Sequence, residues 1–251
     1  QGKFCNSIGF HFLISIFLKT TQSMVVISNG LKDFYVKNGV AEHKILVARD
    51  AVDLNQFGVF INKEEAKNNL RIKTDLPVLM YIGRLDGWKG VETFLEVSKF
   101  FDGKAQAVII GGEDWQIKKL QGRYPQVLFI GYRPYKELAA HQQAADILII
   151  PNTGKDPISM MYTSPLKVFA HMASNIPIIA SKLPSILEVL NEDNAFFFDA
   201  DNESSLRSAI EFVLSNQIEA ERRAKNALND VQNYSWQRRA EDIFNFSIQH
   251  A

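Results

Sequence analysis

The sequence has almost no cysteine. Cys5 is the single one among 251 residues, and one thiol cannot close an internal disulfide bond. A disulfide-stapled secreted scaffold is therefore excluded, and we expect a reducing compartment, the cytoplasm. With 46% hydrophobic residues, a chain of this length buries enough apolar surface to fold without disulfides or a metal ion.

The sequence also lacks an excess of charge of either sign. Its 28 lysines and arginines balance 28 aspartates and glutamates, so the formal net charge is zero. Nucleic-acid-binding domains usually carry a basic surplus, and we expect no nucleic-acid partner, although a local basic patch is compatible with this count. The five histidines show no spacing typical of metal ligands, so we expect neither a metal site nor a cofactor. The five histidines are His11, His43, His141, His171 and His250.

Long apolar runs are absent as well. A helix that spans a bilayer needs about 20 apolar residues, and the longest apolar run, residues 8–18, is shorter and contains His11. We expect a buried helix there, with a helix on a membrane surface as the alternative. The chain begins at Gln1, without an initiator methionine or a basic segment before a cleavage site, so we expect a fragment or a processed chain.

Short apolar runs alternate with amphipathic segments along the chain. Eight runs are predicted as strands: Met24–Ser28, Ile45–Ala48, Val78–Ile82, Gln106–Ile110, Val127–Ile130, Asp146–Ile150, Ile176–Ala180 and Ala195–Phe198. Four segments between them are predicted as helices: Val91–Phe101, Lys136–Ala145, Leu166–Ala173 and Glu203–Leu214. Several strands are apolar throughout, as in parallel sheets covered on both faces. The pattern predicts an α/β fold with a doubly wound, Rossmann-like parallel sheet.

The elements are unevenly distributed, which predicts a domain organisation. Residues 1–57 hold too few elements for an independent α/β domain, so we expect the tail end of a neighbouring domain. Residues 58–75 contain a polar, Lys- and Asn-rich stretch and are predicted as a linker. Residues 76–233 form one complete domain in this interpretation, and residues 234–251 form a helix that packs outside it.

Glycines and two basic residues follow the predicted strand Val78–Ile82. The turn reads Gly83-Arg84-Leu85-Asp86-Gly87-Trp88-Lys89-Gly90 and precedes a helix. Ligands of open α/β sheets bind at the carboxyl ends of the strands. Glycines let the backbone approach a ligand, and Arg84 and Lys89 supply positive charge, so the turn suits a phosphate. The alternative is a surface turn with solvated side chains.

A second candidate anion site follows the predicted strand Asp146–Ile150. After a loop, Pro151–Thr163, the chain continues Ser164-Pro165-Leu166-Lys167 into a helix. Ser164 is predicted as the N-cap and Pro165 as part of the first turn, which leaves backbone N–H groups facing the sheet edge. An anion can bind there beside Lys167. The alternative is an ordinary capped helix.

Several motifs in this order carry a family resemblance. They are Gly83-Arg84-Leu85 with Lys89-Gly90, Gly131-Tyr132, Ser164-Pro165-Leu166-Lys167 followed by Met172-Ala173-Ser174, and Tyr234-Ser235-Trp236. Together they resemble the C-terminal, donor-binding half of retaining glycosyltransferases with the GT-B fold, in glycosyltransferase group 1 (family 4-like). The resemblance covers essentially the whole chain.

This resemblance implies a function and roles for the matching residues. A nucleotide-diphosphate sugar is the expected donor, and Arg84 and Lys89 are the expected catalytic cations, which neutralise its diphosphate without a metal. Backbone amides near Leu166 and Lys167 hold the phosphates, and the Gly131-Tyr132 turn lies against the base. The remaining expected donor contacts are Gly83, Ser164, Pro165 and Ala170. The acceptor, a carbohydrate or a lipid-linked molecule, binds mainly to the N-terminal half, which also provides any peripheral membrane contact.

The sequence departs from the family pattern at two glutamates. Tyr162 and Ala170 occupy these positions, and Ala170 cannot accept hydrogen bonds from the ribose hydroxyls as the second glutamate does. His171 is not expected to replace it, because adjacent helix positions face different directions. A glutamate introduced at position 170 is expected to tighten nucleotide-sugar binding. The alternatives are a degenerate, non-catalytic relative that binds nucleotide sugars or scaffolds a partner, and a GT-B epimerase.

Two further features have structural interpretations. Asp199-Ala200-Asp201 matches the D-x-D metal motif of another glycosyltransferase fold, but it lies between a predicted strand and a helix, so we predict helix capping. Asn175 stands where the family prefers glycine after a helix. Asparagine adopts the left-handed conformation readily, so we expect a normal helix end.

Overall fold

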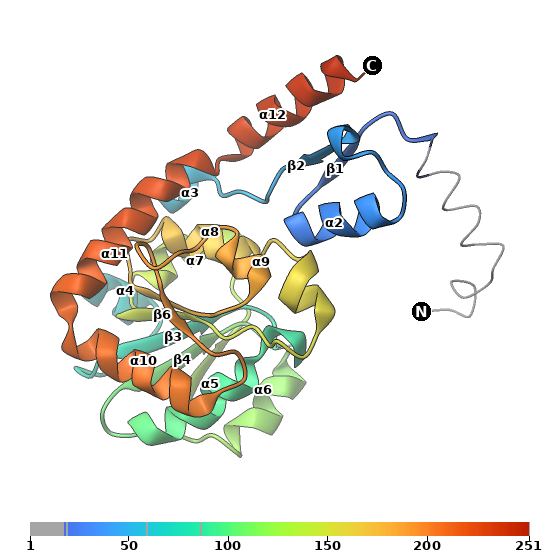
Figure 1. The fold of residues 1–251 in the computed structure, drawn as a ribbon. Helices are drawn as coiled ribbons and strands as arrows, with labels where there is room; N and C mark the ends of the chain where they lie inside the picture. The colour runs from blue at the N-terminus through green and yellow to red at the C-terminus, as the bar shows by residue number, and fades with distance from the viewer. Residues whose placement is uncertain (1–17, 19, 59, 86, 251) are drawn as a thin grey trace.

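The structure is a computed structural model that describes residue 18 and residues 20–58, 60–85 and 87–250 (Figure 1). Cys5 and the predicted apolar helix over residues 8–18, apart from Leu18, lie outside the described residues. Within the part of the chain that is described, no helix has the length and apolar character needed to cross a bilayer.

A six-stranded parallel sheet forms the centre of the molecule. Its strands are β3 (Val78–Ile82), β4 (Gln106–Ile110), β5 (Val127–Gly131), β6 (Ile147–Ile150), β7 (Ile178–Ser181) and β8 (Phe196–Phe198). They are arranged in the order β5-β4-β3-β6-β7-β8, and all neighbours pair in parallel. This confirms the predicted doubly wound α/β fold. β3 and β4 have the predicted bounds, and the other four strands differ from the predicted runs by one or two residues at their ends.

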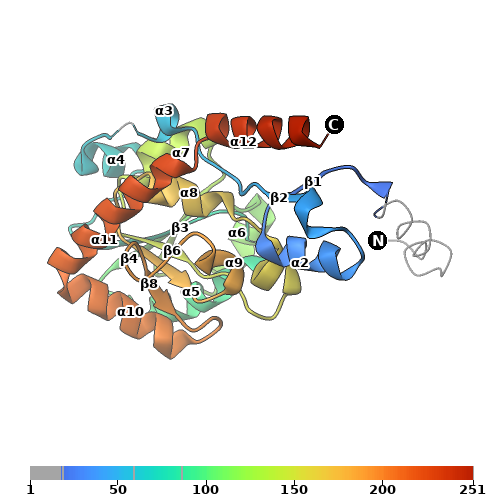
Figure 2. The ribbon, with the colours of Figure 1, turned by 45° about the horizontal axis from the view of Figure 1, so that its top comes forward.

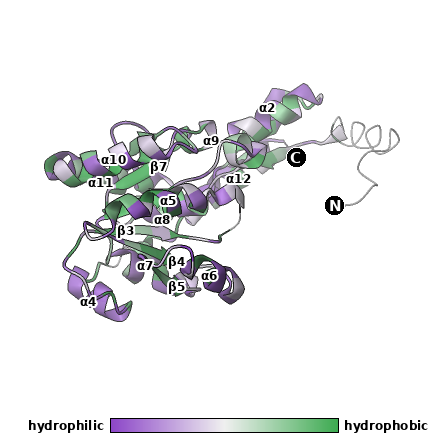
Figure 3. Ribbon diagram, turned by 90° about the horizontal axis from the view of Figure 1, so that it is seen from below, coloured by the Kyte–Doolittle hydropathy of each residue, from purple (hydrophilic) through white to green (hydrophobic). Residues whose placement is uncertain are grey.

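Helices cover both faces of this sheet. One layer holds α5 (Val91–Ser98), α6 (Asp114–Gln121) and α10 (Glu203–Ser215), and the other holds α4 (Lys63–Asn69), α7 (Tyr135–Gln142) and α8 (Leu166–Met172). Helix α11 (Gln217–Asp230) contributes to both cores, with Ala220 in the first and Ala227 in the second. The arrangement explains why the strands are apolar throughout: Leu79 and Tyr81 of β3 belong to the core under α5 and α10, whereas Met80 belongs to the core under α4. Figures 2 and 3 show the helices on the two sides and the hydrophobic strands between them.

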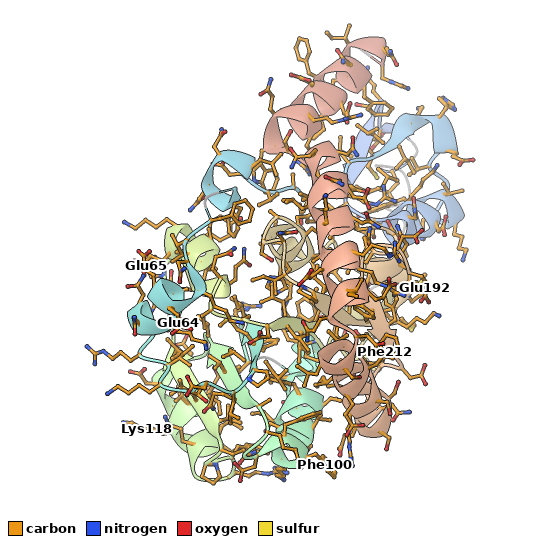
Figure 4. The ribbon with its side chains drawn as sticks, turned by 90° about the vertical axis from the view of Figure 1, so that its left-hand side faces the viewer. Glu64, Glu65, Phe100, Lys118, Glu192 and Phe212 are labelled. Atoms are coloured by element: carbon orange, nitrogen blue, oxygen red, sulfur yellow. The ribbon has the colours of Figure 1, made fainter. Side chains whose placement is uncertain are left out.

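Charged side chains and a few aromatic rings lie on the outside of these layers. Figure 4 labels examples on the outer helices and loops, and all of them are exposed: Glu64, Glu65, Phe100, Lys118, Glu192 and Phe212. The polar stretch that we expected to be a linker contains α4. This helix packs against α7, and it buries Ala66 completely.

A small N-terminal segment lies beside the main sheet (Figure 1). Its strands β1 (Met24–Val26) and β2 (Ile45–Val47) pair in parallel, and α2 (Asn29–Lys37) connects them through the short turn η2 (Glu42–Lys44). The segment contacts the main domain through η5 (Ile158–Tyr162), a π-helical turn inside the predicted loop 151–163, and through Glu188, the C-cap of α9 (Pro184–Leu187). Ser28 donates a hydrogen bond to the Met161 carbonyl, and Glu188 accepts two from the Asn29 N–H.

The C-terminal helix α12 (Trp236–Gln249) runs back towards the N-terminal segment (Figures 1 and 2). Residue 52, just before the short helix α3 (Leu54–Phe57), forms a parallel bridge with Ser235, the N-cap of α12. Arg239 donates hydrogen bonds to the carbonyls of Ala48 and Arg49, and His250 Nε2 lies 3.0 Å from the His43 carbonyl oxygen. The last helix therefore ties the segment before the predicted linker to the end of the main domain.

The predicted capping by Asp199 or Asp201 is wrong. The N-cap of α10 is Asn202, whose side chain accepts a hydrogen bond from the Ser205 N–H. Asp201 adopts a left-handed conformation (φ 61°), and its carboxylate accepts a hydrogen bond from the Gly154 N–H. Asn175 lies in the turn after α8 and adopts the left-handed conformation (φ 58°), as predicted. No group of three or more potential metal ligands occurs among the described residues.

Candidate functional site

The sheet order places a switch point between β3 and β6. From these two central strands the chain winds outward in opposite directions, and a crevice opens outside their carboxyl ends. The two predicted anion-binding segments, residues 83–90 and 151–167, follow these two strands. They touch at Gly90 (φ +66°), where an added Cβ would lie 1.9 Å from the Pro151 carbonyl oxygen. Position 90 therefore requires glycine, and the structure brings the two segments together.

A cavity of about 490 Å³ lies between the two segments. Eight of the predicted site residues line it: Gly83, Arg84, Lys89, Ser164, Pro165, Leu166, Lys167 and Ala170. A larger hollow of about 1010 Å³ adjoins it, shares Gly83 and Arg84 with it, and extends to Tyr132. Gly131 is not among the lining residues; it ends β5 with φ +80°, and its carbonyl accepts a hydrogen bond from the Gly111 N–H.

Lys167 has an unusual environment in this cavity. Its ammonium is buried, and among the residues that the structure describes it has no hydrogen-bond partner; it lies 4.3 Å from the centre of the Tyr81 ring. Burial lowers the pKa of Lys167 well below its ordinary value, and the charge of Lys89 lowers it further. A bound anion offsets both the loss of hydration of the buried ammonium and the repulsion between Lys167 and Lys89. The pair of cations therefore favours anion binding.

The next turn of α8 presents the imidazole of His171 beside Ala170. Lys167, Ala170 and His171 are spaced i, i+3 and i+4, so they share one helix face, and all three line the cavity. The prediction that His171 faces away from the site is therefore wrong. It considered only the neighbouring residue Ala170, although His171 also lies four residues after Lys167 on the same helix face. Burial, with a smaller contribution from Lys167, lowers the pKa of His171 to about 3, so the imidazole is neutral.

Ser164 does not cap α8, in contrast to the prediction. The helix begins at Leu166 with Pro165 in the N-cap position, and no side chain caps it. The Ser164 hydroxyl instead accepts a hydrogen bond of 3.0 Å from the Asp50 N–H. Because Asp50 belongs to the segment before the predicted linker, Ser164 joins two parts of the chain beside the cavity.

The sequence-based reasoning missed two features. Asp50 lines the cavity, and burial raises the pKa of its carboxyl while Arg239 opposes this shift. No motif marked it. Gly111 follows β4 with φ +122°, and an added Cβ would lie 2.1 Å from the Gly83 carbonyl oxygen. The pair Gly111-Gly112 directly after a predicted strand was the available indication.

Comparison with known proteins identifies a family that this chain matches. The profile of the family described as "Glycosyl transferases group 1" matches residues 62–230. The O-antigen chain mannosyltransferase RfbU of Salmonella typhimurium is 25% identical over 221 residues, which cover 84% of this chain and 56% of RfbU. The chain spans about half the length of the curated relatives that it matches.

Solved structures show the same fold. Sucrose-phosphate synthase from Thermosynechococcus elongatus has a TM-score of 0.78 at 21% identity, and the match covers 99% of this chain and 63% of that one. Anabaena Alr3699/HepE in complex with UDP has a TM-score of 0.83 at 14% identity, with 99% and 70% covered. These likenesses identify the fold as the GT-B type, and the comparisons do not favour the epimerase or non-catalytic alternatives. Because the family profile covers residues 62–230, the chain belongs to the glycosyl transferases of group 1.

Proposed function

We propose that this chain binds a nucleotide-diphosphate sugar in the cavity between residues 83–90 and 151–167 and serves as the donor-binding part of a glycosyltransferase. The observation that carries the proposal is the buried ammonium of Lys167, which has no hydrogen-bond partner among the described residues and lies in a cavity also lined by Arg84 and Lys89. Three basic side chains in one cavity at the switch point suit a diphosphate.

The arrangement suits glycosyl transfer. The bond between the anomeric carbon and the β-phosphate oxygen breaks, and negative charge develops on the departing diphosphate. Arg84, Lys89 and Lys167 can stabilise this charge in a partly buried site, which is the form of catalysis that fixed cations provide. Metal-independent transfer and retention of the anomeric configuration are parts of this proposal, and the family resemblance supports the second.

The test is isothermal titration calorimetry with UDP, GDP and ADP. Charge-assisted hydrogen bonds are worth about 1.5–3 kcal/mol each, so Arg84→Ala and Lys89→Ala should each weaken binding roughly ten- to a hundredfold. Lys182→Ala is the matched control, because this exposed lysine pairs with Glu192 away from the cavity. Equal affinities in the wild type and both cavity variants would refute the proposed donor site.

The wider activity is part of the same proposal. We infer that the chain corresponds to the C-terminal half of a two-domain enzyme, that a carbohydrate or lipid-linked acceptor binds mainly to the other half, and that the enzyme works in the cytoplasm. Transfer then needs both halves closed over the donor. The 251-residue chain should bind nucleotide without transferring sugar. Sustained release of nucleoside diphosphate from a nucleotide sugar, dependent on an added acceptor, would contradict this.

A further inference from the structure

The polar groups beside Ala170 form an ordered chain of hydrogen bonds. Gln142 of α7 is buried, and its Nε2 donates a hydrogen bond of 3.0 Å to the Ala170 carbonyl oxygen. Its Oε1 then faces the His171 ring, 3.3 Å from Nδ1. Because a carbonyl oxygen only accepts hydrogen bonds, the contact with Ala170 fixes the orientation of the Gln142 amide.

This orientation determines the tautomer of His171. Gln142 Oε1 is an acceptor, so His171 Nδ1 carries the proton and Nε2 presents a lone pair. His171 Nε2 is buried and has no hydrogen-bond partner among the residues that the structure describes. A second proton on the ring would place a positive charge near Lys167 in a buried site, which burial and charge repulsion both disfavour. The ring is therefore an acceptor that lacks a donor.

The position of this acceptor along the cavity indicates which ligand group it meets. His171 lies one helical turn, about 5.4 Å along the axis, beyond Lys167. On α7, Leu138 lines both the cavity and the larger hollow that reaches Tyr132, and Gln142 follows one turn later on the same face. If the phosphates lie at Lys167 and the base lies in the hollow, the ribose lies between them, beside His171 and Gln142.

We propose that the neutral imidazole of His171, oriented by Gln142, accepts a hydrogen bond from a ribose hydroxyl of the bound nucleotide. His171 thereby supplies the acceptor that Ala170 lacks. This inference rests on the proposed donor site. It makes His171 a binding residue and Gln142 a positioning residue, and it makes the chain selective for ribonucleotides over their deoxy forms.

The test compares ribonucleotides with deoxyribonucleotides by calorimetry. The affinity of the protein for UDP, GDP and ADP is compared in each case with its affinity for the 2′-deoxy and 3′-deoxy forms of the same nucleotide. In the wild type, at least one deoxy form should bind about three- to tenfold more weakly, the range expected for one neutral hydrogen bond. In His171→Phe, the ribonucleotide and that deoxy form should bind equally, within twofold, and the affinity for inorganic pyrophosphate should not change.

His141→Phe is the matched control. His141 is also buried, its Nδ1 also has no partner among the described residues, and it is absent from the lining of the cavity. This variant should keep the full preference for the ribose form. A second measurement needs no variant: the ¹⁵N resonances of His171 should show a protonated Nδ1, and UDP should shift the Nε2 resonance more than its deoxy form does.

The outcomes separate this inference from the proposed donor site. If Arg84→Ala weakens nucleotide binding but the deoxy penalty is absent, or persists in His171→Phe, the donor site stands and the role of His171 is refuted. If His171→Phe instead removes only the advantage of UDP-glucose over UDP, the hydroxyl belongs to the transferred sugar and the ribose assignment is wrong. If no nucleotide or pyrophosphate binds, both proposals fail.

Discussion

Lys167 lowers the stability of the fold, whereas in the proposed donor site it favours nucleotide binding. Its pKa is well below its ordinary value because the ammonium is buried, and because Lys89 adds a second positive charge nearby. At neutral pH the unfolded chain, in which the side chain is solvated, therefore binds the proton more readily than the folded protein does. Lys167 costs folding free energy there, and this cost decreases as the pH rises towards the ordinary lysine pKa.

We expect Lys167→Met to stabilise the fold and to weaken nucleotide binding. Methionine has a similar shape without the charge, so the midpoint of thermal unfolding at pH 7 should rise, by about 2–4 °C for each kcal/mol gained. Binding of UDP, GDP or ADP should weaken at least about tenfold. Scanning and titration calorimetry measure the two effects. Lys155→Met, at an exposed lysine, should change neither. A lower midpoint for Lys167→Met would contradict this account.

Ala170→Glu tests the departure from the family pattern. A glutamate there can accept hydrogen bonds from the ribose diol, worth about 1.5–3 kcal/mol, and costs little helix propensity. Because His171 already offers an acceptor in the same cavity, we expect only part of this gain in the wild type and the full gain in His171→Phe. Nucleotide titrations of the wild type, both single variants and the double variant measure the coupling. An equal gain in both backgrounds would show that the two positions serve different hydroxyls.

At the scale of elements, one carboxylate attaches the N-terminal segment to the main domain. Glu188, directly after α9, accepts hydrogen bonds of 2.8 and 3.1 Å from the Asn29 N–H at the start of α2 and lies 2.9 Å from Arg49. A carboxylate at a helix N-terminus is stabilised by the helix dipole as well as by hydrogen bonds. Gly30 lies so close to Met161 that an added Cβ would be 2.2 Å from its carbonyl oxygen.

We expect Glu188→Gln to loosen this attachment without unfolding the main sheet. The loss should be about 1–3 kcal/mol, because a charged acceptor is replaced by a neutral amide. Hydrogen exchange should therefore accelerate about five- to a hundredfold in residues 24–47 and change little in β3 and β6. Glu192→Gln is the control, since this exposed residue pairs with Lys182 and Arg223 of the main domain and not with the N-terminal segment that the structure describes. Uniformly faster exchange in the central strands would show that the segment is integral to the core.

The elements were predictable from sequence to the extent that burial alone determines them. Runs such as Val78–Ile82 are buried on both faces, so their unbroken apolar sequence indicated the strands and the parallel sheet. Capping was not predictable, because Ser164 bonds to Asp50 and Asp201 bonds to Gly154, partners that only the tertiary fold brings near. That His171 lines the cavity was predictable, because it lies four residues after Lys167 on the same helix face. Its contact with Gln142 was not predictable, because Gln142 lies on another helix.

Across the molecule, the distribution of charge matters more for the attraction of an anion than the net charge does. The formal net charge is zero, so the molecule as a whole does not attract a diphosphate. Among the described residues that line the cavity, however, three are basic, Arg84, Lys89 and Lys167, and one is acidic, Asp50. Such a local excess of positive charge can attract an anion that the net charge does not.

The same distribution predicts that nucleotide binding depends on pH. A diphosphate beside Lys167 favours its protonated form, so the bound protein should have a higher Lys167 pKa than the ligand-free protein, in which burial and Lys89 lower it. Between these two values, binding takes up a proton, and affinity falls as the pH rises, by at most about tenfold for each pH unit.

Titrations between pH 7.5 and 9.5, where the nucleotide phosphate, with a second pKa of about 6, is already ionised, should show this fall. Repeating them in two buffers with different ionisation enthalpies should reveal proton uptake in the heat of binding. Lys167→Met should abolish both the proton uptake and the pH dependence, whereas Lys155→Met should preserve them. A flat affinity with no proton exchange in the wild type would show that Lys167 is already fully protonated before the nucleotide binds, and that its buried ammonium does not sense the ligand.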